Sequence, residues 1–218
     1  MNRIEIKELA KTKIKGNKWN ILWPLLAFGF VEGIIEKIFK LDPYTSVDFT
    51  NLESMMKIEM TPKAAIGSAV LGLLFVIVFV AYKKYIMNFV RTGQFDFKDI
   101  VDCFKEKWLN ILVSSVLTYI VVFVCSMIFV IPGIIMALAY SMVAYVVVDS
   151  DLNGVDSMKK SRAMMKGYKG NYFVFGLSFI GWALLVPFTF GILLIWLVPY
   201  MTIADCIYYE KLKEITKN

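Results

Sequence analysis

The longest uncharged stretch of the chain covers 41 residues, from Trp108 to Val148. One helix needs only about 20 apolar residues to cross the hydrocarbon core of a bilayer, so this stretch is too long for one span and suits two. Its only turn signal is Pro132 and Gly133, near the middle. The pattern therefore predicts a hairpin of two membrane-spanning helices, 108–130 and 133–149, that turns at Pro132 and Gly133.

Other apolar stretches of suitable length lie on both sides of this hairpin. They predict four further spans, at about 20–39, 64–85, 171–187 and 190–209. Since 58% of the 218 residues are hydrophobic, against about 45–50% in soluble domains, the whole chain is expected to form one membrane domain. The fold class is an all-α integral membrane protein, a six-span helical bundle.

The basic residues predict the orientation of this bundle. Of the 24 lysines and arginines, six precede the first span, six lie in 83–107, from the end of the second span to the start of the third, five lie between the fourth and fifth, and three in the C-terminal tail. Loops rich in lysine and arginine stay on the cytoplasmic side of a membrane. We therefore expect a multi-pass protein of the cell membrane with both termini cytoplasmic and the loop 41–62 outside.

Two basic segments also show helical periodicity and predict short interfacial amphipathic helices. The first is 1–18, where the shared face is Ile6, Leu9, Ala10 and Ile14. The second is 155–169, where the shared face is Val155, Met158, Arg162 and Met165. Its basic side chains are expected to contact anionic lipid headgroups: Lys159, Lys160, Arg162, Lys166 and Lys169. Lipid contact of this kind explains the net charge of +6 without nucleic acid as a partner.

Small residues at a spacing of four predict close packing between the first two spans. They are Gly29 and Gly33 on the first span, and Ala64, Ser68 and Gly72 on the second.

Four polar side chains inside the predicted spans are candidates for a binding site: Glu32, Tyr140, Tyr200 and Asp205. Glu32 either faces the bundle interior or marks the point where the first helix emerges from the membrane. Asp205 either joins a site or pairs with a lysine near the end of its span. Pro199 is expected to kink the sixth helix near the middle of the membrane and open space beside the two tyrosines.

The residues expected of an enzyme are missing. The chain has no histidine, and Cys103, Cys125 and Cys206 are isolated, so neither a histidine-based catalytic triad nor a histidine metal site is possible. A glycine-rich phosphate loop is also missing. We expect no enzymatic activity, no metal and no cofactor.

Several strings resemble a family of bacterial membrane proteins known as domain of unknown function 975. They are LAKTKIKGNKW (9–19), IPGIIMALAYSM (131–142), SMKKSRAMMKGYKGNYF (157–173), LSFIGW (177–182), and the later TFGI and PY. The resemblance implies a multi-span protein of Gram-positive bacteria and brings no assigned activity. The Asp-Asn-Pro of the family is Asp149-Ser150-Asp151 here.

Two functions remain open on the sequence alone. One is a non-enzymatic accessory that acts through protein partners or as a homo-oligomer, in envelope maintenance, export or resistance to membrane-active peptides. The other is a small transporter or lipid-binding bundle with a site at mid-membrane. A polar cavity inside the bundle would favour the second function, and a solid apolar interior would favour the first.

Overall fold

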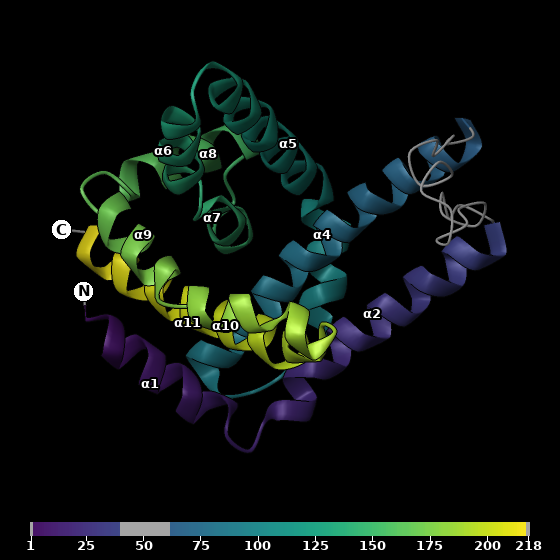
Figure 1. Cartoon of the computed structure of the whole chain (residues 1–218), viewed down its shortest axis with the longest axis horizontal. Helices are drawn as coiled ribbons and strands as arrows, with labels where there is room; N and C mark the ends of the chain where they lie inside the picture. The colour runs from purple at the N-terminus through teal and green to yellow at the C-terminus, as the bar shows by residue number, and fades with distance from the viewer. Residues whose placement is uncertain (1, 40–61, 217–218) are drawn as a thin grey trace.

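The computed structural model of the protein describes residues 2–39 and 62–216, and every regular element within them is a helix (Figure 1). The all-α class is therefore confirmed, whereas the predicted external loop 41–62 lies outside the described residues except for Pro62. The elements are, in order, α1 (Arg3–Ile14), α2 (Lys18–Phe39), α4 (Pro62–Thr92), α5 (Lys98–Ile128), α6 (Val130–Ala139), α7 (Val143–Asp149), α8 (Gly154–Met164), α9 (Lys169–Leu177), α10 (Ile180–Leu185), η1 (Pro187–Thr189) and α11 (Ile192–Thr216).

Five segments of the described chain are long and apolar enough to cross a membrane, which makes this a multi-pass membrane protein. They are Ala65–Thr92, Lys98–Ile128, Val130–Asp149, Lys169–Thr189 and Ile192–Thr216. These segments overlap the second to sixth predicted spans over almost their whole length. The first predicted span forms α2, which is not among the five, so a sixth crossing stays a prediction.

The central hairpin forms, but its turn is not where the sequence predicted it. Helix α5 ends at Ile128, and Phe129 alone is extended, with φ −154° and ψ 145°, before α6 begins at Val130. Pro132 lies in the first turn of α6. The N–H groups of a first turn have no acceptor within the helix, so a proline there costs no helical hydrogen bond. Gly133 serves close packing instead, because a Cβ there would lie 2.8 Å from the Cα of Ser126 on α5.

Two of the spans are interrupted. The fourth breaks at 140–142, between α6 and α7, and the fifth breaks at 178–179, between α9 and α10. Helix α11, in contrast, continues through Pro199 as one element. No proline lies at either break, which is why the sequence did not predict them.

The tightly packed core lies toward one end of the bundle. Fully buried side chains gather on the later part of α4, on α7 and on the later part of α11, including Tyr85, Val146 and Tyr208. Around the turn between α5 and α6 the apolar side chains are exposed, with Phe129 at 70% and Ile131 at 71%. Apolar surface of this kind is what lipid chains cover in a membrane protein.

The predicted N-terminal helix forms as α1, but protein covers its apolar face. Ile6, Ala10 and Ile14 are at most 6% exposed, and α1 packs along α11. An ion pair of 2.6 Å joins Glu5 to Lys211, so α1 and the end of α11 lie together (Figure 1). Leu9, the remaining residue of the predicted apolar face, is 40% exposed and points away from the bundle.

Helix α8 also packs on the bundle, with a face different from the predicted one. Met158 is buried as expected, but Val155 and Arg162 are exposed. The buried face instead includes Ser157 and Ser161, and the hydroxyl of Ser161 donates to the carbonyl of Ala139 at 3.0 Å. Small polar residues on this face let α8 lie close to its neighbours, which a search for large apolar residues misses.

Helices α2 and α4 pack together as predicted, but not through glycines. The Tyr82 hydroxyl donates to the Ile21 carbonyl at 3.1 Å, and the rings of Phe28 and Phe75 are 5.9 Å apart. A Cβ added at Gly29, Gly33 or Gly72 would meet no atom within 4 Å. The two helices run antiparallel, and large side chains join them.

Candidate functional site

A cluster of charged side chains joins the C-terminal ends of α4, α7 and α11 around Asp149, the last residue of α7. We call it the inner charge cluster. Arg91 of α4 forms an ion pair of 2.7 Å with its carboxylate, Lys213 of α11 contacts the same group, and the Tyr209 hydroxyl donates to it at 2.8 Å. The Asp149 side chain is only 6% exposed. Since Arg91 also pairs with Glu210 at 2.6 Å, the cluster connects α4, α7 and α11.

A second pair of charges lies deeper in the bundle. Lys83 precedes Arg91 on α4 by eight residues, and Asp205 precedes Lys213 on α11 by eight residues. Eight helical residues correspond to about 12 Å. Both side chains are partly buried and attract each other electrostatically. Ionisable groups far inside an apolar bundle are costly, so this pair is the strongest candidate for a functional site.

The two charges are not in direct contact. Within the described part of the chain, no ion pair of 4.0 Å or less joins Lys83 to a carboxylate. The ammonium lies instead over the rings of Tyr145 and Phe79, at 4.7 and 5.5 Å from their centroids. The Asp205 carboxylate accepts a hydrogen bond of 3.2 Å from the Tyr172 hydroxyl.

Lys83 lines a cavity of about 330 Å³ between α4, α5 and the break that separates α6 from α7. It is the only charged side chain among the residues that line this cavity. The other polar groups there are hydroxyls, including those of Thr118, Tyr140 and Ser141. The Thr118 hydroxyl oxygen is buried and has no hydrogen-bond partner among the described residues. We call this space the Lys83 cavity.

Asp205 lines a different cavity, of about 340 Å³, on the side of α9 and α10. Aromatic side chains form much of its wall, including Tyr172, Phe175 and Phe179. The two charged side chains therefore line different cavities.

The structure distributes the predicted site residues over different places. Tyr140 lines the Lys83 cavity and Asp205 lines the second one. Tyr200 is only 2% exposed, stacks on Trp196 at 5.0 Å and is not among the residues that line either cavity. Glu32 lies on α2, partly exposed, and lines neither cavity.

Sequence reasoning missed Lys83 and Tyr172. The second span is predicted to end at about Tyr85, because Lys83 and Lys84 begin a basic stretch. Helix α4 instead runs seven residues further, to Thr92. The available signal was that buried apolar residues such as Ile86 and Met87 continue the helical pattern beyond the two lysines.

The basic residues proposed to contact headgroups lie around α8. Lys159, Arg162 and Lys166 are exposed, and Lys160 and Lys169 are partly exposed. Asp156 pairs with Lys159 at 2.8 Å, and this pairing lowers the pKa of the Asp156 carboxyl.

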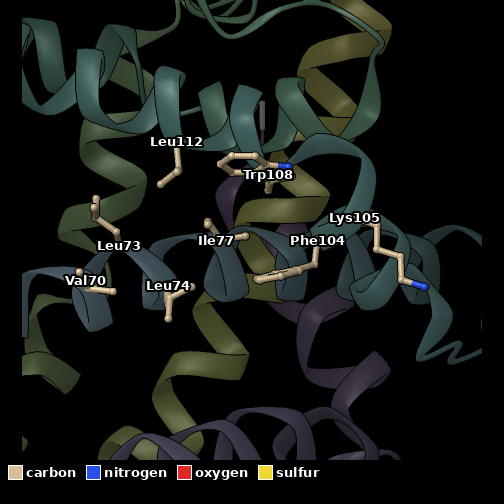
Figure 2. Close-up of a pocket in the computed structure, with 8 residues that line it drawn as sticks. All are labelled: Val70, Leu73, Leu74, Ile77, Phe104, Lys105, Trp108 and Leu112. Atoms are coloured by element: carbon tan, nitrogen blue, oxygen red, sulfur yellow. The ribbon is translucent and has the colours of Figure 1, made fainter. Parts of the chain in front are cut away.

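An apolar groove of about 410 Å³ lies between α4 and α5 (Figure 2). Leu74, Ile77, Phe104 and Trp108 are among the side chains that line it. The side chain of Lys105 points away from the others in Figure 2. The groove therefore offers mainly apolar contacts, which suit an acyl chain rather than a polar group. Within the residues that the structure places, no cluster of cysteines and carboxylates could hold a metal ion.

Residues 116–216 match the model of a family described as "Protein of unknown function (DUF975)". The match confirms the family resemblance over the second half of the chain and includes Tyr140, Tyr172 and Asp205. It does not extend to Lys83 or to the N-terminal string 9–19. No curated protein and no solved structure matches the chain.

Proposed function

We propose that the protein, whose residues 116–216 match the DUF975 family model, is a six-span bundle of the cell membrane that binds a ligand among its helices and catalyses no reaction. The observation that carries this proposal is the Lys83 cavity, where an ammonium group lies deep in an apolar bundle without a described carboxylate in contact. An ionisable side chain in such a place is costly unless it serves a function.

The position of the two termini supports the sixth crossing. Because Glu5 and Lys211 are paired, α1 and the end of α11 lie on one side of the bundle. A chain that starts and ends on the same side crosses the membrane an even number of times. The segments from α4 to α11 supply five crossings, so α2, which runs antiparallel to α4, is the sixth.

The depth of the Lys83 cavity supports a site near the middle of the membrane. Tyr140, on its wall, follows Phe129 at the turn between α5 and α6 by eleven residues, and Lys83, also on its wall, precedes Arg91 of the inner charge cluster by eight residues of α4. At about 1.5 Å per residue these separations are roughly 16 and 12 Å. A ligand site halfway through the bundle is typical of a small transporter or a lipid-binding protein.

The orientation is tested by labelling single cysteines in a chain whose Cys103, Cys125 and Cys206 have been replaced by alanine. We expect an impermeant maleimide to label Ser46→Cys in intact cells, because 41–62 is predicted to be external. Lys159→Cys, at an exposed position of α8, should react only after the cells are opened. Labelling of Lys159→Cys in intact cells would reverse the proposed orientation.

Ligand binding is tested by filling the cavity. Ala144 lies on the wall of the Lys83 cavity, so Ala144→Phe should displace small molecules that co-purify with the protein, as measured by native mass spectrometry. The control is Val124→Phe, at a 52% exposed position of α5, which should retain them. Equal retention by both variants, each eluting as one symmetric peak, would count against a ligand in this cavity.

An accessory role through partners is a second candidate, and the exposed basic side chains Lys159, Arg162 and Lys166 favour it. On a cytoplasmic surface they would contact anionic headgroups or an acidic partner. Replacing all three with glutamine should weaken association of detergent-purified protein with anionic vesicles, in a salt-dependent way, and leave the Lys83 cavity intact.

A further inference from the structure

The Lys83 cavity has the form of a site for an amphiphile. On α4 its wall runs from Phe75 through Phe79 to Lys83, at intervals of four residues. These eight residues correspond to about 12 Å along the helix. One end of this wall is therefore charged and the other end is apolar. Its volume of about 330 Å³ is at the lower end of the range for small-molecule sites, about 300–1,000 Å³.

The polar groups of the cavity favour an anion over a cation. The Lys83 ammonium has three N–H donors. The two rings beside it attract its positive charge, but they offer no oxygen atom that could accept these hydrogen bonds as a carboxylate would. The buried Thr118 hydroxyl, with no partner among the described residues, can donate as well. No carboxylate is found among the residues that line the cavity. An anionic group beside Lys83 would receive charge-assisted hydrogen bonds, which are the strong ones.

We infer that the Lys83 cavity binds a lipophilic monocarboxylate of the long-chain fatty acid class, with its carboxylate at Lys83 and its chain along Phe79 and Phe75. This inference rests on the proposed function and names the ligand class for that site. One ammonium balances one carboxylate charge. The phosphate of a bilayer lipid stays at the membrane surface, about 15 Å from the middle of the hydrocarbon core, and so does not reach this depth while its lipid remains in the bilayer.

Asp205 provides a second test, because it attracts Lys83 and does not line the cavity. A bound carboxylate and Asp205 would share one ammonium group. Removing the Asp205 charge should therefore strengthen binding of an anion, whereas removing the Lys83 charge should weaken it. A purely structural role for the two residues predicts that both changes weaken binding.

The experiment uses the full chain in nanodiscs of zwitterionic phosphatidylcholine. Three fluorescent probes with one alkyl chain and different headgroups are titrated: a carboxylate, a phosphate and a trimethylammonium. We expect the carboxylate probe to bind most tightly. Lys83→Met should weaken its binding by about tenfold or more, Lys83→Arg should stay within about threefold of the wild type, and Asp205→Asn should bind at least as tightly.

Thr118→Val keeps the shape of the side chain and removes the hydroxyl, so it should weaken carboxylate binding by about threefold. It serves as the second variant if Lys83→Met does not elute as a single symmetric peak. Tighter binding of the phosphate or ammonium probe, or equal weakening by Asp205→Asn and Lys83→Met, would overturn the inference. If no headgroup is preferred but native mass spectrometry still finds a ligand that Ala144→Phe displaces, the inference fails and the proposed function stands. If neither probe nor ligand is found, both fail.

Discussion

Replacing Asp149 with asparagine is expected to lower the free energy of unfolding by about 2–4 kcal/mol. The Asp149 side chain is 6% exposed and pairs with Arg91 and Lys213, so the change removes the shared partner of two cations. Loss of one partner from a fully buried ion pair costs about 3–5 kcal/mol. The cations are 32% and 26% exposed, and water reduces the cost for them.

The measurement is thermal unfolding of the purified protein in detergent. For a chain of this length each 1 kcal/mol corresponds to about 2–4 °C in Tm, so a fall of roughly 5–15 °C is expected. Asp151→Asn is the matched control, because Asp151 is fully exposed and contacts only Lys107, at 3.1 Å. It should cost less than about 1 kcal/mol. Similar falls for both variants would show that Asp149 is not the centre of the cluster.

The sequence predicted most of the helical spans because length and charge are properties of continuous segments. The 41 uncharged residues had to form two spans, and α5 is the first of them while α6 and α7 together are the second. The position of their turn was not predictable in this way. Phe129 has no turn signal of its own, and Pro132 is as compatible with the start of a helix as with a turn.

The candidate site was predictable only in part. Tyr140 and Asp205 were found because polar residues stand out inside apolar runs. Lys83 was missed because a lysine at the end of an apolar run usually marks the membrane surface. Only the packing of α4 against α7 and α11 shows that the helix continues inside the protein beyond this lysine. Such contacts join residues more than 50 positions apart, and a pattern within one segment does not contain them.

The same limit applies to α8, whose buried face depends on how closely α5 approaches. Gly154, the first residue of α8, lies so near that an added Cβ would be 2.8 Å from the carbonyl oxygen of Asn110 and 2.9 Å from the amide nitrogen of Ser114. Both are backbone atoms of α5, so no side chain can turn aside to make room. The sequence shows a glycine after Asn153, and Asn153 caps the helix by accepting from the Asp156 amide at 2.8 Å. Nothing in this capping pattern requires glycine at Gly154.

We therefore expect Gly154→Ala to destabilise the protein by about 1–3 kcal/mol, the usual cost of overfilling a packed site. Helix propensity alone predicts the opposite sign, since alanine is favoured over glycine in a helix by up to about 1 kcal/mol. Gly72→Ala, in the interior of α4 where a Cβ would meet nothing within 4 Å, is the control and should be neutral or stabilising. Thermal unfolding of both variants measures the difference. A Tm for Gly154→Ala equal to or above that of Gly72→Ala would show that α8 does not lie against α5 as closely as Gly154 indicates.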